Sequence, residues 1–528
     1  MVNPRTEMSE ILEILNIRSK KMAASTFKIY TIEGIDFDAV IAKYRQLCEE
    51  GEKEIDANSI SVYGNVEPKY TQVRKPRKPL NDDTRILNKA IYLVHTIAYR
   101  EATNREENVE GASIQYAILQ RVIGEDVYEL LKSLQQLGYI EIDGTYIVGT
   151  SSKHYKVIGN IAITHSSNHT ILKYINKTKE LLKDVVLKRM ATPEFKALYG
   201  DTFAETYIKN LNKFKIKDEK GFNKYVNEQI AIQPTKESYY NFIKESFKSD
   251  LKIYSIDGNN RIYHLLTSLE RELKQFINIR FSLDCKNSHP LLFNYFIFNS
   301  KGISIELSYL ISSILFNIDY SYIYSTSLHH YDIEKLCNVL INNNIDKSII
   351  ARFAPDELLY LWKTTTGRFW DDIVKENSGR YKRSVVKKRM FAQVFYSKKE
   401  KDALFASQFK RDYPNVYNLI IRWKEPLKHD DLKNCLLARN KAVLLDGKAY
   451  TKDQETALPN VMMDLESEIF REVLKSLYRK RIPAVHIHDA IVIPDTRAQV
   501  DVEKVESGMR DVYKKHGLHP TFSIDVYD

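Results

Sequence analysis

Three short stretches of this 528-residue chain carry side chains whose types and spacing could do chemistry. The first runs from Ala484 to Asp495, where the pair His488-Asp489 is flanked by apolar residues on both sides. These flanks predict two strands joined by a turn. An acid held rigidly at such a turn is seldom without a partner, and a metal cation is a common one. The stretch predicts either a metal ligand at Asp489 or an ordinary His-Asp pair on a loop.

The second stretch places Asp284 directly after Phe281-Ser282-Leu283. A polar cluster follows, and Pro290 then begins a very hydrophobic helix. We therefore expect Asp284 at the end of a strand, next to the start of a helix, a position that suits a metal-binding carboxylate. An Asp that caps a helix has the same appearance, so this stretch alone leaves both interpretations open.

The third stretch predicts a helix in which Arg383, Lys387, Phe391 and Phe395 are spaced four residues apart. On an α-helix that spacing drifts by only about 40° per step, so the four side chains share one stripe. Fixed cations suit a triphosphate, and aromatic rings suit a nucleobase. The other interpretation is a basic surface helix with a partly buried aromatic end.

In this order, the three stretches resemble motifs A, B and C of the family A polymerase superfamily, which contains the family A DNA polymerases and the single-subunit phage-type RNA polymerases. The resemblance covers residues 258–528, about half of the chain. Two further stretches fit it. Leu458 to Leu474 looks like the helix that precedes motif C, and GNNRIYH, which contains Arg261, resembles the Arg-bearing stretch ahead of motif A.

The resemblance implies a role for each matching residue. Asp284 and Asp489 would bind two Mg²⁺ ions, or Mn²⁺ in their place, with the backbone carbonyl of Cys285 as a further metal ligand. Arg383 and Lys387 would hold the triphosphate, and Lys387 would also donate a proton to pyrophosphate. Phe391 and Phe395 would pack near the nascent base pair, and His488 would contact the primer end. The implied substrate-binding residues are Arg261, Arg383, Lys387, Phe391, Phe395, Tyr396 and His488.

The chain departs from the family's pattern at positions that bear on the choice of sugar. The family A DNA polymerases follow the motif A Asp with a run that includes a Glu, which helps to exclude a 2′ hydroxyl, whereas the run here is CKNSHP. The helix position usually held by Tyr is Phe395 here. Ala490 follows Asp489, where DNA polymerases usually have Glu and phage-type RNA polymerases usually have Ser. The choice between deoxyribose and ribose therefore stays open.

The preferred interpretation is a DNA-directed DNA polymerase that extends a 3′ hydroxyl on a template and uses nucleoside triphosphates. The N-terminal half has no convincing set of exonuclease carboxylates, which predicts no proofreading. One alternative is a DNA-directed RNA polymerase of the single-subunit type. Another is a non-enzymatic replication initiator or regulator that binds DNA. An HD-type phosphohydrolase would carry its His-Asp pair on a helix, and the strand-like flanks of Asp489 argue against it.

Charge and composition agree with a nucleic-acid partner. The net charge of +10 and the pI near 8.9 fit a polyanion-binding surface. The four cysteines form no CxxC or other zinc spacing, so we expect reduced thiols in a cytoplasmic protein. No apolar run reaches the roughly 18 residues of a membrane span, so no membrane partner is expected. The sequence does not indicate an oligomeric state.

The expected fold is α+β and mostly helical. It is a right-hand polymerase with a small antiparallel palm sheet that holds the two acids, surrounded by helical fingers and thumb, and preceded by a winged-helix-like domain. A final strand, Thr521 to Val526, would complete the palm sheet. The expected regions are an unassigned segment 1–75, a winged-helix-like DNA-binding domain 76–161, a thumb-like helical region 162–255, and the palm and fingers 256–528.

The winged-helix prediction rests on a pattern of helices followed by a hairpin. Helices are expected from Arg85 to Tyr99, from Ile114 to Ile123 with Ser113 as its cap, and from Glu125 to Leu137, before a hairpin around Asp143-Gly144. The helix that ends at Leu137 could enter a major groove. The basic segment from Glu67 to Asp83 is expected to be a linker.

Overall fold

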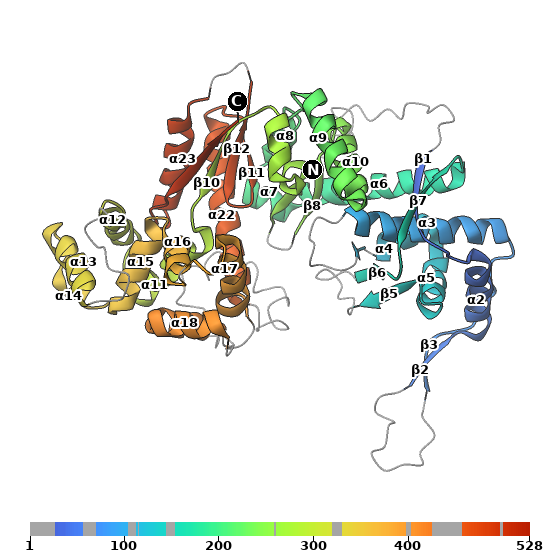
Figure 1. The fold of residues 1–528 in the computed structure, drawn as a ribbon, viewed down its shortest axis with the longest axis horizontal. Coiled ribbons are helices and arrows are strands. Elements are labelled where there is room, and N and C mark those ends of the chain that lie inside the picture. The colour runs from blue at the N-terminus through green and yellow to red at the C-terminus, as the bar shows by residue number, and fades with distance from the viewer. Residues whose placement is uncertain are drawn as a thin grey trace, which may run out of the picture. The chain divides into compact units, whose positions relative to one another are not determined.

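The computed structural model describes residues 27–55, 70–103, 112–114, 116–143, 154–257, 260–318, 330–377, 379–397, 403–424, 457–496 and 500–527. Most of these residues are helical, and the strand pairs among them are antiparallel. The fold is therefore α+β and mostly helical, as predicted (Figure 1). Among the described helices, none combines the length and the apolar character needed to cross a bilayer.

The chain forms two compact units, and each is assembled from separated segments. Unit 1 comprises Met1–Phe195, Asp218–Gly258 and Ile262–Leu269. Unit 2 comprises Lys196–Lys217, Asn259–Arg261 and Glu270–Asp528. Residues 162–255 are therefore divided between the two units. Helix α7 (Pro193–Tyr199) contains the first boundary.

Unit 1 is built around helix α3. Its helices and 3₁₀ turns are α2 (Phe37–Glu50), α3 (Asp83–Thr103), α4 (Tyr116–Ile123), η2 (Gly124–Asp126), α5 (Val127–Gln136), α6 (His169–Met190), α9 (Glu219–Ile232), η3 (Pro234–Lys236), α10 (Glu237–Lys248) and η4 (Leu265–Ser268). Its paired strands are β1 (Phe27–Ile32) with β7 (Ile161–Ser166), β2 (Glu52–Ile55) with β3 (Tyr70–Arg74), and β8 (Ile253–Ile256) with β9 (Ile262–His264). A three-stranded sheet has the order β4-β6-β5, from Ala112–Ser113, His154–Val157 and Ile140–Asp143.

The three helices predicted before the hairpin are present as α3, α4 and α5. Ser113 lies in strand β4, and helix α4 begins at Tyr116, so the predicted helix start at Ile114 directly after Ser113 is wrong. Strand β5 pairs with β6, which is His154–Val157. The second hairpin strand that we predicted after Gly144 lies outside the described residues.

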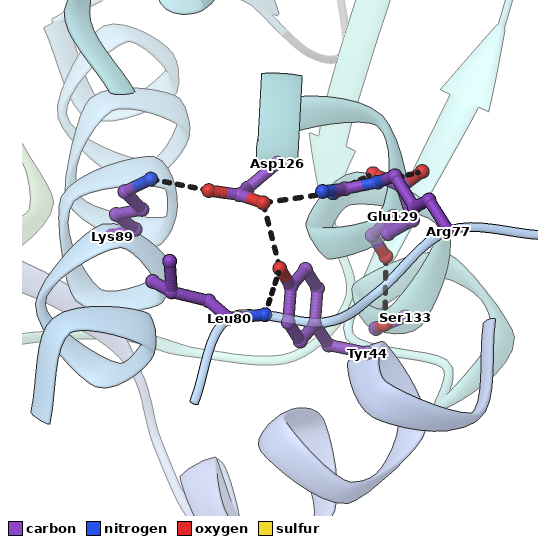
Figure 2. Close-up of polar contacts among 7 residues, drawn as sticks. All are labelled: Tyr44, Arg77, Leu80, Lys89, Asp126, Glu129 and Ser133. Carbon is purple, nitrogen blue, oxygen red and sulfur yellow. Dashed lines mark hydrogen bonds and ion pairs between the residues drawn. The ribbon is translucent and has the colours of Figure 1, made fainter. Parts of the chain in front are cut away.

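Helix α5 is packed against the rest of unit 1 on one side. Helix α2 packs against it, and several of its residues are buried. They are Val127, Glu129, Leu130, Leu131, Ser133 and Leu134. Arg77 donates hydrogen bonds to Asp126 Oδ1 and to Glu129 Oε2, each 2.8 Å long (Figure 2). The Glu129 side of the helix is therefore packed within unit 1, whereas Lys132 and Gln135 are only half-buried and Gln136 is exposed. Insertion of this helix into a major groove stays a prediction.

The contacts beside α5 also hold the segment that we predicted to be a linker. They join Tyr44, Arg77, Lys89, Asp126 and Glu129, which we call the ion cluster. The Tyr44 hydroxyl donates to Asp126 Oδ1 at 2.6 Å, and the Lys89 ammonium binds the other oxygen of Asp126 (Figure 2). Burial alone would raise the pKa of Asp126, but hydrogen bonds from Lys89, Tyr44 and Arg77 lower it to about 2. Because Arg77 is held in this cluster and Tyr70–Arg74 forms strand β3, the described part of the segment is not a free linker.

Unit 2 combines a small sheet with a larger set of helices (Figure 1). The helices and turns are α8 (Phe203–Leu211), η5 (Arg271–Phe276), α11 (Ser288–Ser300), α12 (Ile305–Phe316), α13 (His330–Asn342), α14 (Lys347–Ile350), α15 (Pro355–Thr365), α16 (Phe369–Glu376), α17 (Arg383–Met390), the π-helical turn η7 (Phe391–Phe395), α18 (Leu404–Asp412), α19 (Pro414–Lys424), α22 (Ala457–Arg479) and α23 (Val502–Lys514). The sheet has the order β11-β12-β10-β13, from Val485–Ile487, Ala490–Pro494, Ile279–Cys285 and Phe522–Val526.

This sheet confirms three predictions made from the sequence. The strand-turn-strand around Asp489 is present as β11 and β12, the strand that carries Asp284 is β10, and the final strand is β13. Cys285 contacts Tyr513 of α23, which lies against one face of the sheet. Side chains alternate along a strand, so Asp284 lies on the opposite face from Cys285.

Candidate active site

Two acids from distant parts of the sequence meet on the sheet of unit 2. Strand β10 pairs with β12 so that Asp284 lies opposite Ala490, the residue after Asp489. The backbone N–H of Cys285 donates to the carbonyl oxygen of Asp489 at 3.0 Å. The side chains of Asp284 and Asp489 are close enough to form a hydrogen bond with each other. We call these two residues the acid pair.

The charged form of the acid pair is disfavoured by its surroundings. Burial and the neighbouring Asp489 raise the pKa of Asp284 to about 7, while Lys387 acts in the opposite direction. Burial and the nearby Glu466 raise the pKa of Asp489, again against Lys387. Two adjacent carboxylates in a partly buried site repel each other, and a cation between them would relieve that repulsion.

The acid pair fits a cation that brings further ligands with it. In the described part of the chain, no group of three or more His, Cys, Asp or Glu side chains is arranged to hold a metal ion. Mg²⁺ prefers oxygen ligands and is often held by one or two carboxylates plus the phosphates of a substrate. The thiol of Cys285 is buried on the other face of the sheet, so the predicted ligand at this residue remains its backbone carbonyl. His488 is exposed at the turn beside Asp489, with a left-handed φ of 52°.

Helix α17 brings one of its two predicted cations to the acid pair. Lys387 is half-buried and favours the charged form of both Asp284 and Asp489. Arg383, one turn earlier, forms an ion pair with Asp371 at 3.0 Å, and both side chains are about half exposed. Lys387 therefore lies with the acid pair, whereas Arg383 contacts Asp371 of helix α16.

The aromatic half of the predicted stripe is altered by the π-helical turn η7. The N–H of Tyr396 donates to the carbonyl of Phe391 at 2.7 Å, a bond that encloses one residue more than an α-helical turn does. Phe395 is fully buried and packs on Phe293 and Phe409. Phe391 is half-buried and stacks on Tyr396, with ring centroids 5.0 Å apart. The expectation of one continuous stripe is wrong, because Phe395 turns into the core.

A buried polar network that the sequence analysis missed lies next to the acid pair. Glu466 of α22 is 5% exposed and accepts a hydrogen bond from the Ser288 hydroxyl at 3.0 Å. The same oxygen lies 3.2 Å from Nε2 of His289, and the other oxygen pairs with Arg261. Nδ1 of His289 is hydrogen-bonded to the Tyr396 hydroxyl. We call these five residues the Glu466 network: Arg261, Ser288, His289, Tyr396 and Glu466.

Glu466 is held in its charged form by this network. Burial alone would raise its pKa, but His289, Arg261 and Ser288 together lower it to about 2. Arg261, predicted to bind substrate, is thus engaged by a buried carboxylate. A signal was present in the sequence, because Glu466 lies among the apolar residues Met462, Leu465 and Ile469 of a predicted helix. A charged residue at a core position needs a partner.

Comparison with known proteins adds no family to this picture. No protein-family model matches the chain, and no curated protein sequence matches it.

Proposed function

We propose that this chain is a template-directed nucleotidyltransferase, specifically a DNA-directed DNA polymerase that adds nucleotides to a 3′ hydroxyl without proofreading. The observation that carries the proposal is the contact between the Asp284 and Asp489 side chains, with Lys387 as a charge that favours the ionised form of both. Asp284 and Asp489 lie more than two hundred positions apart in the sequence, and two partly buried acids repel each other, so their contact is expected where a cation binds between them.

Each residue of the site has a role in this proposal. Asp284 and Asp489 would hold two Mg²⁺ ions, or Mn²⁺, which supply charge stabilisation for phosphoryl transfer when bound. Lys387 would balance the triphosphate charge and donate a proton to the leaving pyrophosphate. The stacked rings of Phe391 and Tyr396 would offer a flat surface to a nucleobase. His488, exposed at the turn, would meet the primer end.

The arrangement of elements supports the same proposal. A strand that leads into a helix, β10 then α11, and the hairpin β11-β12 supply the two acids from adjacent strands. We infer that this sheet is a polymerase palm and that α16 to α18 belong to the fingers. In unit 1, the order α3, β4, α4, α5, β5, β6 with the sheet β4-β6-β5 supports a winged-helix-like module. The nucleic-acid contact of unit 1 would use the part-exposed side of α5 together with surfaces such as the exposed Lys173 and Lys177 of α6.

Primer extension tests the proposal directly. The purified chain is given a primed DNA template, Mg²⁺ and either deoxyribonucleotides or ribonucleotides. We expect extension with deoxyribonucleotides, and a loss of about a thousandfold or more in Asp489→Asn, because metal-assisted phosphoryl transfer depends on the ligand charge. Asp495→Asn is the matched control, because Asp489 and Asp495 flank the two ends of β12 and Asp495 is exposed. Equal activity in wild type and Asp489→Asn would refute the site.

The same experiment separates the alternatives. Extension with ribonucleotides alone would identify a single-subunit RNA polymerase, for which the missing motif A Glu is the supporting observation. No extension together with tight binding to duplex DNA would favour a non-enzymatic initiator or regulator.

A further inference from the structure

The geometry points to Glu466 as a positioning residue that acts through His289 and Tyr396 to hold helix α17, and so Lys387, over the acid pair. This inference rests on the proposed function. It assigns a role to a buried network whose Glu466 also acts on Asp489 through its charge.

Glu466 is the junction of the network. It joins α22 to the start of α11 through Ser288 and His289, and to the segment that carries Arg261. A carboxylate with these partners accepts several charge-assisted hydrogen bonds, which are stronger than neutral ones and fix direction as well as distance. Glu466→Gln keeps the shape of the side chain but removes the negative charge that orients its donors Arg261, Ser288 and His289.

His289 connects Glu466 to Tyr396, which lies just after helix α17, the helix that carries Lys387. Its Nε2 faces the Glu466 carboxylate, so the N–H lies there and Nδ1 is left to accept the Tyr396 hydroxyl. Both His289 and Glu466 are buried. The hydroxyl of Tyr396 is therefore tied to two other helices, α11 and α22.

The π-helical turn makes the contact with Tyr396. One extra residue in a turn rotates the following side chains by about 100°, which directs Phe395 into the core and Tyr396 toward His289. Lys424 holds the same turn from the other side, through the Val394 carbonyl and through the Ser397 hydroxyl at 2.8 Å. The hydrogen bonds of His289 and of Lys424 therefore fix the C-terminal end of this helix, and through it the position of Lys387.

A double-mutant cycle in the full chain tests the inference. Tyr396→Phe and Glu466→Gln each remove one link, and we expect each to lower kcat/KM for nucleotide about tenfold, the effect of losing one buried hydrogen bond to a charged network. In the Lys387→Gln background, each should lower kcat/KM less than about twofold, because the link acts through Lys387. A loss that is equally large in both backgrounds would overturn the positioning role. Tyr381→Phe, two residues before the start of α17, is the matched control and should change little.

Hydrogen exchange tests the same inference without a measurement of activity. In Tyr396→Phe and Glu466→Gln, amides of residues 391–397 should exchange at least about fivefold faster than in wild type, and those in Tyr381→Phe should not. Unchanged exchange would overturn the inference even in an active enzyme. If the wild-type chain extends no primer while exchange responds as expected, the proposed function fails and the structural link stands.

Discussion

At the scale of single residues, the acid pair lowers the stability of the metal-free fold and favours the binding of a cation. Burial and mutual repulsion raise the pKa of Asp284 above its ordinary value, so the ionised carboxylate costs folding free energy near neutral pH when no cation is bound. The same unfavourable contact favours cation binding. Sites that store strain of this kind are commonly stabilised by substitutions that abolish activity.

The substitution Asp284→Asn should therefore stabilise unit 2 in metal-free buffer. The folded-state pKa is raised, so the carboxylate is destabilising above the unfolded pKa, and at pH 7.5 its removal should add about 1–3 kcal/mol to the free energy of unfolding. All three tryptophans, Trp362, Trp370 and Trp423, belong to unit 2, so urea unfolding followed by tryptophan fluorescence measures it. Asp495→Asn should change stability by less than about 0.5 kcal/mol. A less stable Asp284→Asn protein would contradict the prediction.

Two adjacent lysines of helix α17 should differ sharply in their contribution to catalysis. Lys387 is half-buried and acts on the acid pair, whereas Lys388 is exposed. Lys387→Gln should lower kcat by about a hundredfold or more, the usual range for a general acid and charge donor, and Lys388→Gln should lower it less than about threefold. Primer-extension kinetics at saturating nucleotide measure both. Similar losses in the two variants would show that net basic charge, and not position, matters.

At the scale of elements, local context decides what a helix exposes. The segment Val127–Gln136 has the pattern of a helix that could enter a groove, yet α2 and the ion cluster cover one side of it. The stripe on α17 ends where η7 adds a residue to the turn. Both helices were predicted correctly, but the stripe on α17 was not, because the direction of its aromatic side chains depends on their neighbours and on one hydrogen bond.

The ion cluster of Figure 2 should make unit 1 sensitive to acid. The pKa of Asp126 is lowered to about 2, below its ordinary value of 3.8, so its contribution is present above the unfolded pKa and is lost as pH falls from about 4 to about 2. The difference corresponds to about 2 kcal/mol. Far-UV circular dichroism during urea unfolding at pH 6 and at pH 3 measures the loss, and Asp126→Asn should reduce it.

An exposed ion pair in the same unit provides the control for that experiment. Arg45 and Asp83 pair at the surface, with side chains 41% and 64% exposed. Surface pairs contribute about 0–1 kcal/mol, so Asp83→Asn should leave the acid sensitivity of unit 1 as it is. An equal effect of the two substitutions would show that general charge, and not the buried cluster, causes the sensitivity.

At the scale of the whole molecule, the two units are discontinuous in sequence. Lys196–Lys217 belongs to unit 2 although unit 1 residues precede and follow it. Within unit 2, the Tyr207 hydroxyl lies 3.1 Å from Nδ1 of His486 in β11, and the N–H of Lys217 donates to the carbonyl of Phe276 at 2.8 Å. The segment therefore supports the strand that leads to Asp489.

Core substitutions should separate the two units in unfolding experiments. Tyr207→Ala removes a fully buried ring from unit 2 and should lower the stability seen by tryptophan fluorescence by about 3–5 kcal/mol. Leu130→Ala, in the core of unit 1, should lower the transition seen by circular dichroism and leave the fluorescence transition unchanged. If Leu130→Ala shifts the fluorescence transition equally, the units unfold as one.

The sequence by itself determined the strand-turn-strand around Asp489, the strand that ends at Asp284, the last strand of the sheet and the helices that contain Pro290, Lys387 and Glu466. These follow from hydrophobic periodicity and turn residues, which act over a few neighbouring residues. Only the tertiary structure decided that the two acids touch, that Lys387 and not Arg383 accompanies them, that Phe395 is core, and that Glu466 joins His289 to Tyr396. The reason is that contacts across hundreds of residues, burial and one widened helical turn are set by packing, which a local pattern does not encode.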